Sequence, residues 1–179
     1  MKINRLALTA ALLCSTAAVG AHADAFNRIA SFPVAGNLPE GVDAGTPTSS
    51  EIIAATEDGM TLVYSDSPLG AIGIVDITDP ASPKPGGAVM MDGEPTSLAV
   101  RGGRAFVAVN TSQSFTEPSG VLKIVDLADR SVTESCDLGG QPDSVAIAAD
   151  GSFLAIAIEN ERDEDLDDGA LPQLPAGAV

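Results

Sequence analysis

A repeat with a spacing of 47 residues most constrains what this chain can fold into. The stretch "GEPTSLAVRGGRAFVAVN", which starts at Gly93, aligns with "GQPDSVAIAADGSFLAIAIEN", which starts at Gly140. Each copy contains an alternating strand, a tight glycine turn and a second apolar strand, which is the pattern of a β-hairpin. A more diverged copy, "EIIAATEDGMTLVYSDS", precedes them and has Asp58 and Gly59 at its turn. The chain is therefore built from a repeated structural unit.

Each hairpin is followed by a third and a fourth strand. "GAIGIVDI", from Gly70, matches "GVLKIVDL", from Gly120, and the stretches "GGAVMM" and "SVTESCDL" give a weaker fourth strand after each. Four strands per unit at this period are typical of β-propeller blades, which bury their two faces by stacking. We expect an all-β chain with about two and a half four-stranded blades, at about 50–92, 93–139 and 140–179, the last incomplete.

The composition agrees with many short strands. Aromatic residues make up 3% of the chain, while 18 Gly and 12 Pro separate short runs of Val, Ile and Ala. At the end of the sequence, "GAV" (Gly177 to Val179) aligns with "GVL" (Gly120 to Leu122), the start of a third strand. We expect an amino-terminal fragment of a larger propeller, whose remaining blades come from a missing C-terminal chain. The alternative is assembly with other chains.

The first 23 residues have the features of a bacterial signal peptide. Lys2 and Arg5 precede an apolar run, and "AHA" provides a cleavage site after Ala23. We expect a periplasmic or secreted protein with an extended segment at 24–49. Cleavage removes His22, the only histidine, and Cys14, so that neither imidazole chemistry nor an internal disulfide remains. The remaining cysteine, Cys136, is predicted to be a small, half-buried strand residue.

The chain is strongly acidic, with 25 Asp and Glu against 9 Lys and Arg. Such a surface repels phosphate backbones and anionic lipid headgroups. We therefore expect no nucleic-acid partner, and the apolar run at the N-terminus is too short for a membrane span. Cations and basic partners fit this charge, as does a simple role in solubility.

One rim of the predicted blades is the candidate binding site. The loops between second and third strands are "DSPLG", "NTSQSFTEPSG" and "NERDEDLDDGALPQLPAG", and equivalent loops of stacked blades lie on the same face. The predicted small-molecule or protein-binding residues of this rim are Asp66, Asn110, Glu117, Asn160 and Glu161.

The third of these loops is also a candidate calcium site. Asp163, Asp165 and Asp167 have the alternate spacing found among ligands of hard cations. The loop is not an EF-hand, because Asp168 and Leu174 stand where that motif requires Gly and Glu. The choice between a looser calcium site and a solvated acidic loop stays open.

The residues also resemble a known family. "EIIAATEDGMTLVYSDSP", "GEPTS", "GGQPDS" and "AIENERDEDLDDGALPQLPAG" look like the amino-terminal propeller of the bacterial exported esterase-like activity of phytase family, often labelled alkaline phosphatase, with generic YVTN-type repeats. This resemblance implies a longer exported protein associated with phosphoric ester or ester hydrolysis. Calcium is a further association by analogy, since β-propeller phytases use it.

No catalytic residue is assigned. The sequence contains no G-x-S-x-G elbow, S-x-x-K motif, P-loop or Cys/His cluster. We expect an exported binding or scaffold segment that is inactive alone. The alternative is that its acidic rim completes a calcium-dependent phosphoesterase site in the intact protein.

Overall fold

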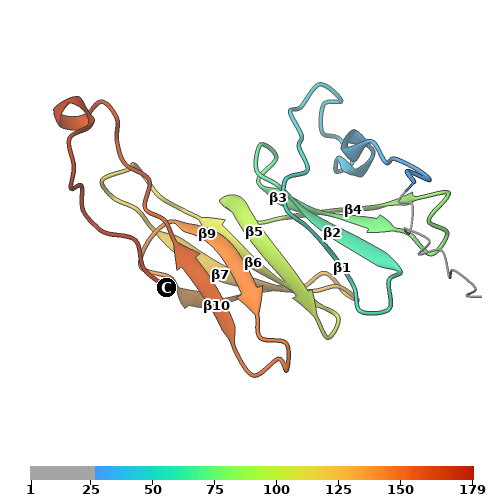
Figure 1. The fold of residues 1–179 in the computed structure, drawn as a ribbon. Coiled ribbons are helices and arrows are strands. Elements are labelled where there is room, and N and C mark those ends of the chain that lie inside the picture. The colour runs from blue at the N-terminus through green and yellow to red at the C-terminus, as the bar shows by residue number, and fades with distance from the viewer. Residues whose placement is uncertain (1–26) are drawn as a thin grey trace, which may run out of the picture.

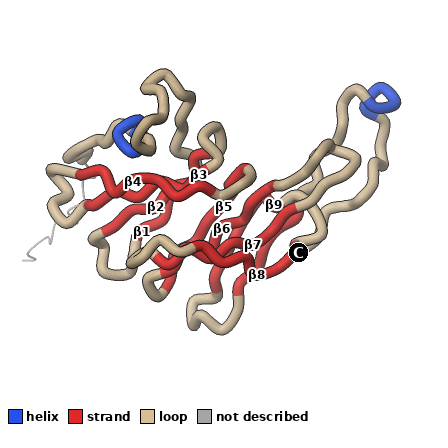
Figure 2. Tube along the Cα trace, turned by 180° about the vertical axis from the view of Figure 1, so that it is seen from behind, coloured by secondary structure: helices blue, strands red, loops and turns tan. Residues whose placement is uncertain are grey.

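The computed structural model describes residues 27–179 and contains three β-sheets arranged side by side (Figures 1 and 2). Blade 1 has the order β1-β2-β3-β4, with β1 (Ile53–Ala55), β2 (Thr61–Asp66), β3 (Ala71–Asp76) and β4 (Lys84–Met90). Blade 2 has the order β5-β6-β7-β8, with β5 (Glu94–Arg101), β6 (Arg104–Asn110), β7 (Gly120–Asp126) and β8 (Val132–Asp137). Blade 3 contains β9 (Pro142–Ile147) and β10 (Leu154–Ile158). Two 3-10 turns complete the elements, η1 (Val34–Asn37) and η2 (Leu166–Gly169).

These sheets confirm the predicted fold class of partial β-propeller blades. All pairings within them are antiparallel, and each strand pairs with its neighbour in sequence. The third blade also begins a third strand, because Ala178 forms an isolated antiparallel bridge with Ile158. This bridge corresponds to the pairing of Val121 with Val109 in blade 2. The alignment of "GAV" with "GVL" therefore predicted the pairing.

The turns have the chemistry that their sequences indicate. In the β1–β2 turn, the Asp58 carboxylate accepts hydrogen bonds from the Met60 amide at 3.0 Å and from the Thr56 hydroxyl at 2.6 Å. Gly59 has a φ of 69°, a left-handed conformation that glycine adopts without steric cost. Asp76 and Asp126 accept hydrogen bonds from the backbone amides two residues later and thereby cap the turns that follow β3 and β7.

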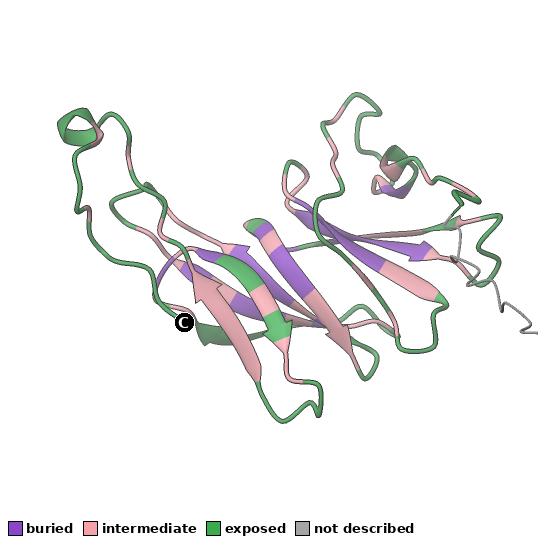
Figure 3. Cartoon of the chain, in the orientation of Figure 1, coloured by how far each residue is buried: buried purple, intermediate pink, exposed green. Residues whose placement is uncertain are grey.

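The main core lies between blades 1 and 2 (Figure 3). Alternating Val, Ile and Leu side chains of β2 and β3 pack against those of β5, β6 and β7, and Val63, Ile72 and Val107 are 0% exposed. Lys123 is also buried there, and its ammonium group donates to the Met91 carbonyl and pairs with Asp92 at 3.4 Å. Stacking of the blades thus buries surface that one sheet could not cover.

The outer strand of blade 2 differs from our expectation for Cys136. All six residues of β8 are exposed, including this cysteine, so the prediction of a half-buried thiol was wrong. The reason is positional, because β8 is the edge strand of its sheet and makes no contribution to the core between the blades.

Residues 27–49 precede the first strand, whereas the predicted signal peptide and its cleavage after Ala23 lie outside the described residues. The segment 27–49 contains η1, which contacts β3 and β4. Within the described residues, no helix is long and apolar enough to cross a membrane.

Candidate functional site

The loops that connect second and third strands emerge at one rim of the stacked blades (Figure 1). They are the β2–β3 turn at 67–70, the β6–β7 loop at 111–119, and the segment 159–177 that follows β10. The strands run in the same order in each blade, so these connections share a face, while the β1–β2, β5–β6 and β9–β10 turns lie at the opposite rim. This arrangement is the one that the repeat predicted.

A groove of about 480 Å³ lies between the β6–β7 loop and the segment after β10. We call it the acidic groove and define it by its lining, which consists of Phe115, Glu159, Glu161, Arg162, Asp163, Glu164 and Asp165. Five of these seven residues are acidic, and the Arg162 guanidinium pairs with the Glu164 carboxylate at 3.4 Å. Phe115 is 49% exposed and is the single aromatic side chain in this lining. The groove therefore combines an accessible ring with excess negative charge.

A second depression of about 400 Å³ adjoins the first and shares Phe115 and Glu161 with it. Its other lining residues are polar and come from blades 2 and 3: Glu94, Asn110, Ser112, Gln113, Ser114 and Gln141. Within blade 3, Gln141 Nε2 donates to Glu161 Oε2 at 3.0 Å and the Glu161 amide donates to Gln141 Oε1 at 3.2 Å. The two depressions form one continuous polar surface around Phe115.

Two of the five predicted rim residues line this surface. Asn110 is held by its Nδ2 donating to Glu94 at 3.1 Å, and Glu161 borders both depressions. Glu117 is exposed in the β6–β7 loop but lies outside both linings.

The other two predicted rim residues organise the loops. Asp66 is 1% exposed, and its Oδ1 accepts from the amides of Ser49 at 2.9 Å and Leu69 at 3.2 Å. Asn160 accepts from the Gln141 amide at 2.8 Å and donates to the Ala176 carbonyl at 3.1 Å. Asn160 thus joins the beginning of the segment 159–177, which we call the acidic segment, to its end.

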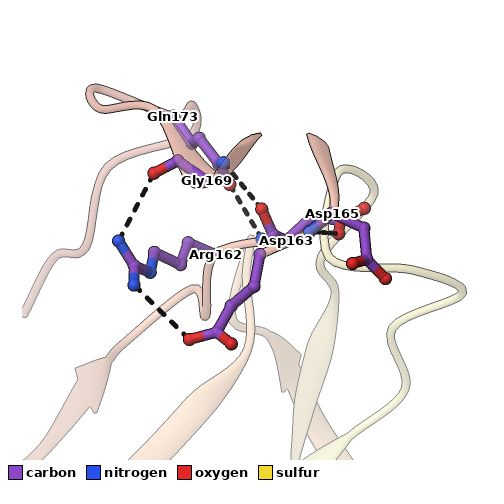
Figure 4. Close-up of polar contacts among 6 residues, drawn as sticks. Arg162, Asp163, Asp165, Gly169 and Gln173 are labelled. Atoms are coloured by element: carbon purple, nitrogen blue, oxygen red, sulfur yellow. Dashed lines mark hydrogen bonds and ion pairs between the residues drawn. The ribbon is translucent and has the colours of Figure 1, made fainter. Parts of the chain in front are cut away.

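Two of the three aspartates predicted to bind calcium, Asp163 and Asp165, lie close together in the segment 159–177 that follows β10 (Figure 4). Asp163 and Asp165 both line the groove, and the Asp165 amide donates to Asp163 Oδ1 at 2.9 Å. The backbone of Asp163 is fixed by Gln173, through two hydrogen bonds of 2.8 Å each. Asp167 lies in η2, outside the lining, with a φ of 50°. Among residues 27–179, no group of three His, Cys, Asp or Glu side chains is arranged to hold a metal ion.

Four residues that line the acidic groove were not among the predicted site residues: Phe115, Glu159, Arg162 and Glu164. Phe115 had a sequence signal, because it is the one aromatic residue in an otherwise polar loop. Its proximity to the next blade depends on the conformation of two loops, and strand periodicity does not specify loop conformation.

Comparison with known proteins defines the family. The model of the choice-of-anchor I domain matches residues 51–179, which include all ten strands. The chain belongs to the choice-of-anchor I domain family. A choice-of-anchor domain suggests an exported surface or scaffold module. No curated protein matches this choice-of-anchor I domain in sequence.

Solved structures support the propeller-like fold of this choice-of-anchor I domain. Hydrazine synthase of Kuenenia stuttgartiensis is similar at a TM-score of 0.51 and 20% identity, over 61% of this chain and 30% of that chain. A candidate 6-phosphogluconolactonase of Bacteroides fragilis is similar at a TM-score of 0.50 and 14% identity, over 76% of this chain and 40% of that chain. The domain thus spans less than half the length of either structure, and at these identities the likeness concerns the fold.

Proposed function

We propose that this choice-of-anchor I domain is an exported binding or scaffold module that recognises cationic groups at the acidic groove. The observation that carries the proposal is the exposed Phe115 ring beside carboxylates of the next blade. A lysine or arginine side chain placed over an aromatic face gains cation–π attraction, and nearby carboxylates attract the same charge. The net charge of −16 favours encounter with basic partners.

Titration with a lysine-rich peptide tests this proposal. Phe115→Ala is expected to weaken binding about threefold, which corresponds to about 0.7 kcal/mol for an exposed cation–π contact. Phe153→Ala is the matched control, because Phe153 is 65% exposed in the β9–β10 turn at the opposite rim. Equal losses in both variants, or no binding by the wild-type domain at low salt, would show that the groove is not the recognition site.

A second candidate function is a calcium-dependent phosphoesterase site to which the acidic segment contributes in a longer protein. It is favoured by Asp163 and Asp165, which line the same groove and are joined by a hydrogen bond. Calorimetric titration with calcium separates this candidate from the first. The triple variant Asp163→Asn, Asp165→Asn, Asp167→Asn should abolish calcium binding while Glu134→Gln, in exposed β8, should leave it intact. Unchanged affinity in the triple variant contradicts the candidate.

We further propose that the domain is one part of a phytase-like esterase or phosphatase protein and is inactive by itself. The support is the sequence resemblance described above and the greater length of the similar structures. Hydrolysis of p-nitrophenyl phosphate by the purified domain would argue against an inactive module.

We also propose that the protein is exported by a signal peptide that is cleaved after Ala23. N-terminal sequencing of the exported protein tests this cleavage site directly.

A further inference from the structure

The second depression, which adjoins the acidic groove, differs from that groove in its chemistry. It is lined by two carboxylates, three amide side chains, two serines and one aromatic ring. Its volume of about 400 Å³ lies in the range of small-molecule sites, about 300–1,000 Å³. Most such sites are lined mainly by apolar side chains. A lining dominated by amides, hydroxyls and carboxylates therefore indicates a ligand that carries many polar groups around a small apolar surface.

The apolar part of the lining is the Phe115 ring, which a tight turn presents. The Glu117 amide donates to the Ser114 carbonyl at 3.2 Å, and the hydroxyls of Ser114 and Thr116 lie 3.2 Å apart. Phe115 is the second residue of this four-residue turn, and it is 49% exposed. The turn fixes the backbone below the ring, so that a ligand packing on the ring orders little of the chain.

The two carboxylates of the second depression are each held by an amide side chain. Asn110 Nδ2 donates to Glu94 Oε2 at 3.1 Å in blade 2, and Gln141 Nε2 donates to Glu161 Oε2 at 3.0 Å in blade 3. The repeat aligns Glu94 with Gln141, so both pairs form where the first strand of a blade begins. An ionised carboxylate has about four lone-pair sites, so both keep acceptors for the donors of a ligand.

The third amide of the lining is Gln113, which is exposed and lies two residues before Phe115. Its side chain offers two donors and one acceptor. The Ser112 hydroxyl instead supports the loop, because it accepts from the Ser119 amide at 2.9 Å and donates to the Ser119 carbonyl at 3.2 Å. Gln113 therefore supplies the donors that the two carboxylates lack.

We propose that the second depression binds a neutral saccharide, with one sugar ring packed on the Phe115 ring. The hydroxyls of this sugar bond to Gln113, Glu94 and Glu161. A pyranose fits because one face of its ring carries C–H groups, which pack on the negative face of an aromatic ring, while each hydroxyl both donates and accepts. The two carboxylates repel uronic acids and sugar phosphates, which selects against anionic sugars. The ligand is thus distinct from the cationic group proposed for the acidic groove, although the two sites share Phe115.

A microarray of neutral and anionic glycans, probed with the purified chain, tests the proposal. Neutral glycans are expected to bind and anionic ones are not. Calorimetric titration with a neutral glycan that binds should give the same Kd at low and high salt, because the ligand carries no charge to be screened. The proposal is overturned if no neutral glycan binds, if only anionic glycans bind, or if salt abolishes the binding.

Three variants locate the site. Phe115→Ala should weaken glycan binding about tenfold, whereas Phe115→Tyr, which keeps the ring, should bind as the wild type does. Gln113→Ala should weaken glycan binding about fivefold through lost hydrogen bonds. Phe153→Ala, at the opposite rim, is the control and should leave glycan binding unchanged. Wild-type glycan affinity in both Phe115→Ala and Gln113→Ala would overturn the proposal, as would an equal loss in Phe153→Ala.

The lysine-rich peptide separates this site from the acidic groove. Gln113 does not line the acidic groove, so Gln113→Ala should bind the peptide as the wild type does while its glycan binding is weakened. Peptide binding by a wild-type chain that binds no neutral glycan overturns the saccharide site and leaves the acidic groove supported. Glycan binding by a chain that does not bind the peptide gives the reverse result.

Discussion

Asn37 Nδ2 donates a hydrogen bond to the Tyr64 hydroxyl at 3.0 Å and thereby joins the N-terminal segment to blade 1. Asn37 is 2% exposed, and its Oδ1 also accepts from the Gly87 amide at 2.9 Å. Burial raises the pKa of Tyr64 above its ordinary value, while the bond from Asn37 opposes that rise. A polar residue of a segment without strands thus satisfies buried groups of β3 and β4.

Asn37→Ala is expected to lower the free energy of unfolding by about 2 kcal/mol, because it leaves buried donors and acceptors unpaired. Tyr64→Phe removes only the hydroxyl and should cost about 1 kcal/mol. Urea denaturation followed by circular dichroism measures both. Equal stability of Asn37→Ala and the wild type would show that the segment is not docked through this residue.

Gly73→Ala should destabilise blade 1, because an added Cβ would overlap the Tyr64 ring that lies across Gly73 in β3. Overpacking of this kind costs about 1–3 kcal/mol. Gly36→Ala is the control, since its Cβ would lie 3.3 Å from a carbon of the Phe32 ring, which can adjust. Thermal unfolding of the two variants should differ in this order, and a tolerated Gly73→Ala would contradict the position of Tyr64.

Acidification should weaken the turns at the rim opposite the groove. The Thr56 hydroxyl and the Met60 amide hold the pKa of Asp58 below its ordinary value, and Ser152 does the same for the pKa of Asp150. A carboxylate whose pKa is lowered by folding stabilises the protein above its unfolded pKa, and this stabilisation is lost as the pH falls through the folded pKa. Thr56→Val should return the pKa of Asp58 toward its ordinary value in a carboxyl NMR titration. An unchanged titration midpoint would contradict the hydrogen bond.

The strands were predictable because they repeat. The alternation of apolar residues predicted the hairpins of the three blades, and the alignment of Gly177 with Gly120 located the bridge between Ile158 and Ala178. These features depend on backbone periodicity and on turn residues, which act locally.

Other features depend on contacts between distant segments. Nothing in the sequence around Asn37 indicates that it bonds to β3, and nothing around Asp66 indicates that its carboxylate caps the Ser49 amide. Burial of Lys123 follows from its position between blades, where the Met91 carbonyl accepts from its ammonium group. The opening of the acidic groove likewise depends on where Phe115 meets the next blade.

The loops of blades 2 and 3 share one rim and form the acidic groove. A spin label attached at Glu164→Cys, in a Cys14→Ser, Cys136→Ser background, tests this arrangement by paramagnetic broadening of backbone amide signals. We predict strong broadening at Phe115 and its neighbours, with little at the β1–β2 turn on the opposite rim. Sharp signals at Phe115 together with a broadened β1–β2 turn would contradict the stacked arrangement and the groove with it.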